Sequence, residues 1–175
     1  MTEYHPGLDG VIATESSISD IDGEKGILSY RGYSIEELAE KSTFEETAFL
    51  LLTGELPTKT ELENFKSDIV DSMDLPTELI DLLRAYPKKS DSMFVLQSVI
   101  AVLGSYYSVD FDAEKLKTNY YTKDYYLKVS ATLLGSIGSV VATWNRIKNK
   151  KDVVSPDKEM NYAQNFMLML DDSIN

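Results

Sequence analysis

The stretch GVIATESSISDIDGEKGILSYRGYSIEEL, which runs from Gly10 to Leu38, decides the fold class. Its first half is rich in β-branched and hydroxyl side chains, which favour extended backbone. The segment DGEKG, residues 22–26, is typical of a turn, and ILSYRGY follows as a second extended run. We therefore predict a short β-hairpin over residues 10–33. Ser34 then opens a helix, with Glu37 placed to complete a capping box.

Helix signals fill the remaining residues, 34–175. Two further capping boxes are expected, one from Ser42 or Thr43 with Glu45 or Glu46, and one from Thr58 with Glu61. Two further residues mark helix boundaries: Gly54 as a helix-ending glycine and Pro76 in a first helical turn. A long helix is expected over about 125–151, and a last helix begins with NYAQNFMLML. The sequence therefore predicts a mainly α fold of about eight helices behind one short hairpin, within a single domain spanning residues 1–175.

Composition narrows the classes of function. The chain has 175 residues, a formal net charge of −12 and no cysteine. Such an acidic surface repels phosphate backbones and anionic lipid, so we expect no nucleic-acid or membrane partner. A chain without thiols forms neither disulfides nor a thiolate zinc site. We see no signal peptide, and the longest uncharged run, residues 129–145, is shorter than a spanning helix needs. We expect a cytoplasmic protein.

Three features could suggest a ligand site. His5 is the only histidine, and a metal site at it would rest on carboxylates alone. The segment DIDGEKG starts like a calcium loop, with Asp20, Asp22 and Gly23, but the later ligands are out of register, and a hairpin turn explains it. The segment LLGSIGSVV lacks the Lys-Ser/Thr of a phosphate loop. We interpret all three as structural.

Two acidic pairs and one arginine are further candidates for catalytic or binding groups. The pairs Glu36–Glu37 and Glu45–Glu46 each fall in a first helical turn, where carboxylates favour the helix dipole. Neighbouring residues of a helix do not share a face, so an acid–base pair is a poor interpretation. Arg31 in YRGY is either a guanidinium stacked between two tyrosines or an anion ligand. We favour the structural role.

Small residues are spaced four, three and four apart at Ala131, Gly135, Gly138 and Ala142. This spacing places them on one helix face, where another helix can approach closely. Two interpretations stay open: packing within the chain, and a two-fold helix pair across a dimer.

The order of turn glycines, capped helices and YRGY in residues 7–62 resembles the start of citrate synthases of the bacterial and archaeal dimeric kind. The likeness continues through LPTELIDLLRAYPK, SMFVLQSVIAVLG, RIKNKKDVVSP and YAQNFMLML, and so covers nearly the whole chain. The resemblance implies a citrate synthase-like large-domain portion with the small domain absent. It also implies a homodimer that condenses oxaloacetate with acetyl-CoA and water to give citrate and CoA.

The resemblance also implies the family's mechanism. An aspartate removes a proton from the thioester methyl group, one histidine stabilises the enol that forms, and another polarises the oxaloacetate carbonyl. None of these residues can be placed here, and His5 matches neither histidine. We assign no catalytic, cofactor-binding or metal-binding residue to this chain and expect no bound cofactor, acetyl-CoA being the family's co-substrate. The parent reaction is open between citrate and methylcitrate synthesis.

The chain departs from the family pattern at four places. Asp91-Ser92-Met93 stands where relatives usually carry His-Pro-Met, and Leu96-Gln97-Ser98 stands where they carry Leu-Arg-Thr. Lys150 and Asp172 replace glycines that usually follow the long helix and the last helix. We therefore hold three hypotheses: an N-terminal portion of a synthase that is inactive alone, a non-catalytic subunit that pairs with itself or a full-length relative, and one half of a split synthase.

Overall fold

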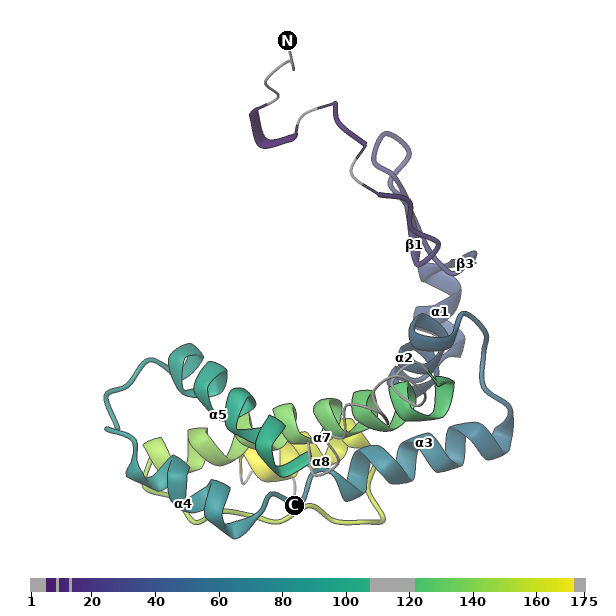
Figure 1. Ribbon diagram of the computed structural model, residues 1–175. Helices are drawn as coiled ribbons and strands as arrows, with labels where there is room; N and C mark the ends of the chain where they lie inside the picture. Colours follow the sequence, from purple (N-terminus) through teal and green to yellow (C-terminus); the bar gives the residue numbers. More distant parts are fainter. Residues whose placement is uncertain (1–5, 9, 13, 108–121, 172–175) are drawn as a thin grey trace. The chain divides into compact units, whose positions relative to one another are not determined.

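The computed structural model describes residues 6–8, 10–12, 14–107 and 122–171 (Figure 1). The chain divides into two compact units, Met1–Pro57 and Thr58–Asn175. Within the described residues, helices dominate and a small antiparallel sheet lies near the N-terminus. The prediction of a mainly α fold with a short N-terminal hairpin is confirmed. His5 and Asp172 lie outside the described residues.

The first unit begins with a short 3₁₀ turn, η1 (Pro6–Leu8), and a sheet of three strands in the order β1-β2-β3. The strands are β1 (Ser19–Asp22), β2 (Ile27–Tyr30) and β3 (Tyr33–Ser34), all antiparallel. The expected first strand is therefore too long, because residues 11, 12 and 14–18 are not in a strand.

The second expected strand, residues 27–33, is also wrong, because a tight turn divides it. Tyr30 pairs with Tyr33, so Arg31 and Gly32 form a two-residue loop. Their φ angles are +51° and +88°, the two positive values that a type I′ hairpin turn requires. The sheet therefore gains a third strand before the first helix.

Two helices complete this unit, α1 (Ile35–Lys41) and α2 (Phe44–Thr53). The Thr43–Glu46 capping box forms in full, since each side chain accepts the other residue's backbone N–H. The box expected at Ser34 is only half formed: Ser34 accepts from the Glu37 N–H, while the Glu37 carboxylate accepts from Lys41 at 3.3 Å. α2 ends at Gly54, which has a φ of +92°.

The second unit contains α3 (Lys59–Asp71), α4 (Thr77–Ala85), α5 (Ser92–Tyr107), α7 (Lys123–Lys148) and α8 (Tyr162–Leu170). The long helix α7 packs against all four others, so it is the central element of the unit (Figure 1). The Thr58–Glu61 box forms as expected. Pro76 is the N-cap of α4 rather than a residue of its first turn.

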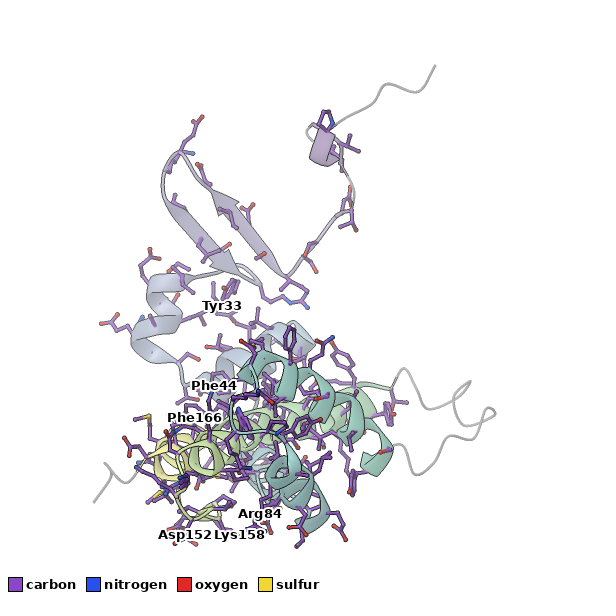
Figure 2. All side chains as sticks on the ribbon, turned by 90° about the vertical axis from the view of Figure 1, so that its left-hand side faces the viewer. Tyr33, Phe44, Arg84, Asp152, Lys158 and Phe166 are labelled. Carbon is purple, nitrogen blue, oxygen red and sulfur yellow. The ribbon has the colours of Figure 1, made fainter. Side chains whose placement is uncertain are left out.

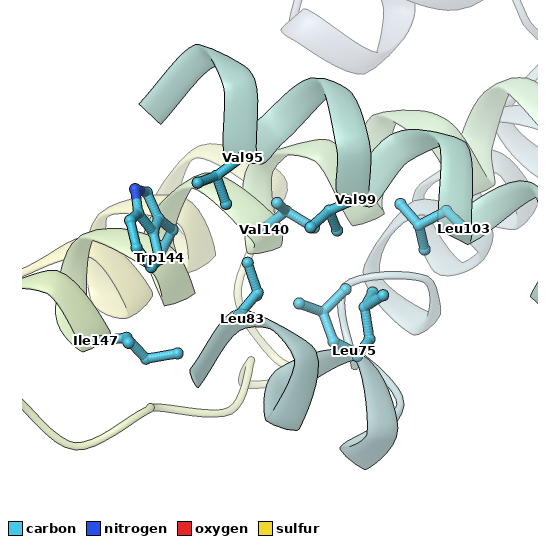
Figure 3. Packing of buried hydrophobic residues seen from close by; sticks show 9 residues of the cluster. Leu75, Leu83, Val95, Val99, Leu103, Val140, Trp144 and Ile147 are labelled. Atoms are coloured by element: carbon cyan, nitrogen blue, oxygen red, sulfur yellow. The ribbon is translucent and has the colours of Figure 1, made fainter. Parts of the chain in front are cut away.

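One apolar cluster joins α4, α5 and α7 (Figure 3). Its best-buried members include Leu79, Leu83 and Val99, each 0 % exposed, and Trp144 of α7 closes one end. Burial of each large aliphatic side chain contributes about 1.5–3 kcal/mol to folding. This cluster therefore fixes α4 and α5 on one side of α7.

A smaller cluster fixes α8 to α7. It contains Met73, Ala142 and Met169, with Phe166 and Tyr162 packed against them. Figure 2 shows Phe166 on α8 and Lys158 in the segment that precedes it. Lys158 forms an ion pair of 3.0 Å with Asp71 at the end of α3, and this pairing raises the pKa of Lys158.

Candidate functional site

Arg31 has a structural position in the first unit. Its Nη1 donates to Ser17 Oγ at 2.7 Å, and its Nη2 donates to the Leu51 carbonyl at 2.9 Å. Leu51 lies in the last turn of α2, where carbonyl groups lack partners within the helix. Stacking on Tyr30 or Tyr33 is not among the contacts of Arg31 in the described residues. The structural prediction for Arg31 is confirmed, with hydrogen bonds to Ser17 and α2 in place of the expected stacking.

The turn between β1 and β2 accounts for the residues that resemble a calcium loop. Asp22 Oδ1 accepts from the Lys25 backbone N–H at 3.0 Å, and Oδ2 pairs with Lys25 Nζ at 2.6 Å. These two interactions with Lys25 hold the pKa of Asp22 below its usual value. The carboxylate therefore closes the hairpin.

The acidic pairs serve the helix ends on which they lie. Glu36 and Glu37 occupy the first turn of α1, and Glu45 and Glu46 the first turn of α2. Glu46 Oε2 accepts from the Thr43 backbone N–H at 2.7 Å. The structural interpretation of these pairs is confirmed.

The small residues of α7 pack within the chain. Ala131 and Ala142 are both 0 % exposed. A methyl group on Gly135 would overlap the Ile69 carbonyl of α3, and one on Gly138 would lie 2.8 Å from the Tyr162 hydroxyl of α8. The stripe therefore lets α3 and α8 approach α7, so the interpretation as packing within the chain is confirmed, and pairing of two helices across a dimer stays a prediction.

Two departures from the family pattern have partners in the structure. Asp91 Oδ1 accepts from the Met93 N–H at 2.8 Å at the start of α5, and Ser92 Oγ accepts from the Trp144 indole N–H at 3.2 Å. In the other segment, Ser98 Oγ accepts from the Tyr86 hydroxyl at 2.8 Å. Ser92 thus ties α5 to α7, and Ser98 ties it to the end of α4, whereas the bond of Asp91 stays within the start of α5.

Lys150 stands at a position whose backbone suits glycine. Its φ is +59°, its N–H donates to the Ile147 carbonyl, and the Lys151 N–H donates to the Arg146 carbonyl. These two bonds form the Schellman motif that commonly ends helices, with Lys150 at the site where glycine is usual. Lysine in place of the family's glycine therefore has a strained backbone, but the helix still ends in the usual way.

Sequence reasoning missed two buried polar groups near α8. Arg146 is 3 % exposed and donates to carbonyl groups of α8. Asn165 is 0 % exposed; it accepts from the Asp157 N–H at 2.7 Å and donates to the carbonyls of Asp157 and Met160. Neither residue belongs to a local motif, so the sequence carries no signal for these bonds.

The described ranges hold no group of three or more His, Asp or Glu side chains placed to bind a metal ion. The helix α7 is long and apolar enough to cross a membrane by length and composition, and half of that apolar stretch is buried within the fold. It has the burial of a core helix.

Comparison with known proteins gives one consistent result. The family model described as "Citrate synthase, C-terminal domain" matches residues 7–175. A citrate synthase from Acidithiobacillus ferridurans is 35 % identical over 95 % of this chain and 42 % of its own length. The chain thus spans about two fifths of the curated relatives it matches.

The solved structures that resemble this chain are citrate synthases as well. Citrate synthase from Pyrobaculum aerophilum aligns with a TM-score of 0.81 and 35 % identity over 94 % of this chain and 41 % of that one. Citrate synthase from the thermophilic archaeon Thermoplasma acidophilum, in a ternary complex with carboxymethyl coenzyme A and oxaloacetate, aligns with a TM-score of 0.82 and 27 % identity over 97 % and 42 %. The chain belongs to the citrate synthase family.

Proposed function

We propose that this chain is the N-terminal portion of the large domain of a citrate synthase-type acyltransferase. The whole enzyme would condense oxaloacetate with acetyl-CoA and water to give citrate and CoA. The family match over residues 7–175 carries this proposal. The Thermoplasma acidophilum relative, solved with carboxymethyl coenzyme A and oxaloacetate, supports the choice of substrates.

The chain alone would be inactive. Among the described residues, the two acidic pairs that could suggest an acid and a base lie in the first turns of α1 and α2, and Glu46 caps α2. General acid–base catalysis needs groups that can reach the substrate with a suitable pKa. The aspartate and two histidines that the family resemblance implies would come from the part of the enzyme that this chain does not span.

A complementation experiment tests this proposal. The chain would be produced together with a separate polypeptide that supplies the remaining three fifths of a related citrate synthase. We expect CoA release from acetyl-CoA only when both polypeptides and oxaloacetate are present. A control complement with its catalytic aspartate replaced by asparagine should give none. Propionyl-CoA in place of acetyl-CoA would distinguish a methylcitrate-type parent. A stable complex without activity would contradict the proposal.

A second candidate is a non-catalytic subunit that binds a partner, either a second copy or a full-length synthase. The observation that favours it is the outer face of α5. This 16-residue helix carries no charged side chain, and its Met93 and Phe94 are 67 % and 73 % exposed. Exposed apolar patches commonly mark interaction sites. If the chain is one half of a split synthase, the same face of α5 would bind the other half.

Size-exclusion chromatography with light scattering separates these candidates. We expect Phe94→Asp to abolish association if the face of α5 binds a partner. Thr60→Asp, which adds the same charge to the exposed start of α3, should leave association unchanged. A chain that stays monomeric with and without a full-length synthase would exclude the subunit hypothesis. Under either function we propose a cytoplasmic protein without nucleic-acid or membrane partners.

A further inference from the structure

Arg146 brings a positive charge into the interior of the second unit. It lies in the last turn of α7 and is 3 % exposed. Its Nη2 donates to the Leu168 carbonyl at 3.0 Å, and its Nε donates to the Met169 carbonyl. Its Nη1 donates to the Asp152 carbonyl at 3.4 Å. One guanidinium thus joins the end of α7, the loop that follows it, and the end of α8.

The carbonyl groups that Arg146 contacts are those a helix cannot satisfy by itself. The last four carbonyls of an α-helix lack intrahelical partners, and the C-terminal end carries partial negative charge. Met167 accepts from the Asp171 N–H, and Arg146 supplies donors to the next two carbonyls. Burial of these carbonyls without donors would cost free energy.

Two neighbours of Arg146 complete the attachment. Asn145 Nδ2 donates to the Leu170 carbonyl at 3.3 Å, and Lys151 Nζ pairs with Asp171 Oδ1 at 3.1 Å. Every carbonyl from residue 167 to residue 170 therefore has a donor, and residues 145–151 supply three of these contacts with the last turn of α8. The planar fork of the guanidinium suits two adjacent acceptors better than an ammonium does.

We propose that Arg146 is a positioning residue that holds the last turn of α8 in a fixed orientation on α7. The apolar cluster at α8 includes Met73 and Met169, beside Phe166 and Tyr162, and methionines are flexible side chains that specify position poorly. The guanidinium supplies the directional contacts that these residues lack. Its relevance to catalysis rests on the proposed function, because the remaining part of a synthase must be held in a fixed position on this scaffold.

Hydrogen exchange on the 175-residue chain tests the lock without reference to activity. Arg146→Met keeps the aliphatic stem and removes all donors, and we expect exchange in the last turn of α8 to rise by about tenfold or more. Arg146→Lys keeps a cation near the carbonyls and should restore part of the protection. Lys148→Met, at an exposed position of the same turn, is the control and should change nothing.

Two results would overturn the proposal. One is that Met at position 146 protects α8 as well as Arg does, which would mean that the side chain acts by packing. The other is that exchange rises equally in α3, α4 and α5, which would mean general destabilisation. If Arg146→Met fails to fold, the same comparison on Arg146→Lys decides between these results.

In the complemented enzyme, Arg146→Lys should lower kcat with KM unchanged. An inactive wild-type complement would count against the proposed function and leave the exchange result valid.

Discussion

Gly135 of α7 lies directly against the backbone carbonyl of Ile69 in α3, with no space for a methyl group between them. Ser136, the next residue, donates from Oγ to the Ser72 carbonyl at 3.2 Å. The two helices therefore meet through backbone and small side chains, and this contact requires glycine at position 135.

We predict that Gly135→Ala destabilises the chain by about 1–3 kcal/mol, because an inserted methyl group forces packed backbone to move. Urea unfolding monitored by circular dichroism would measure the change. Gly104→Ala is the matched control, since a methyl group there meets nothing within 4 Å. That control should raise stability by about 0.5–1 kcal/mol, the usual gain on replacing glycine in a helix. Equal effects of the two substitutions would show that the close approach is unimportant.

Lys150 offers the opposite test, a residue in a conformation that glycine adopts more easily. We predict that Lys150→Gly raises the free energy of unfolding by about 0.5–1 kcal/mol, because it relieves the left-handed backbone at the helix end. Lys148→Gly, inside the last turn of α7, should instead lower it by about 1 kcal/mol. Thermal unfolding of the three proteins would show the order, and a loss of stability in Lys150→Gly would contradict the explanation.

These positions show how far the sequence alone predicts the fold. The Thr43–Glu46 and Thr58–Glu61 boxes were predictable because their partners are three residues apart. The turn at Arg31 was not, because a positive φ at a residue other than glycine leaves no mark in composition.

Long-range contacts limited the prediction of the site. Spaced small residues indicate a close approach, but they do not say whether the approaching helix belongs to the same chain. The bonds from Arg146 to Leu168 and Met169 span 22 and 23 residues and end on backbone atoms. Any residue type supplies a backbone carbonyl, so no sequence pattern marks these acceptors.

Glu61 gives a prediction on pH. The Thr58 backbone N–H and hydroxyl donate to its carboxylate at 2.9 and 2.7 Å. These bonds, with a smaller contribution from the charge of Lys123, hold the pKa of Glu61 below its usual value. A lowered pKa in the folded state means that the stabilisation is present above the ordinary glutamate pKa and is lost as the pH falls through the lowered value.

We therefore expect the Glu61→Gln variant to lose less stability than the wild type when the pH falls below about 4.5, because it lacks the titrating carboxylate. Chemical unfolding at a series of pH values would measure it. Thr58→Ala removes the hydroxyl and keeps the backbone N–H, so it should reduce the pH dependence without abolishing it. An unchanged pH profile in Glu61→Gln would show that the capping box does not contribute to acid sensitivity.

The contact between α5 and α7 can be followed through Trp144, the only tryptophan in the chain. We predict that Ser92→Ala, which removes the acceptor of the indole N–H, lowers stability by about 1 kcal/mol and shifts the fluorescence of Trp144. Ser105→Ala is the control, since the Ser105 hydroxyl donates to the Val102 carbonyl within its own helix. A fluorescence spectrum identical to that of the wild type would mean that the bond to Ser92 is not formed in solution.

We propose that this chain supplies a scaffold of the citrate synthase family without a complete set of catalytic groups. The most direct measurement is the initial rate of CoA release by the purified 175-residue chain with saturating oxaloacetate and acetyl-CoA. We expect no rate above that of the same mixture without protein. A turnover that rises in proportion to the concentration of the chain, and that yields citrate, would contradict it.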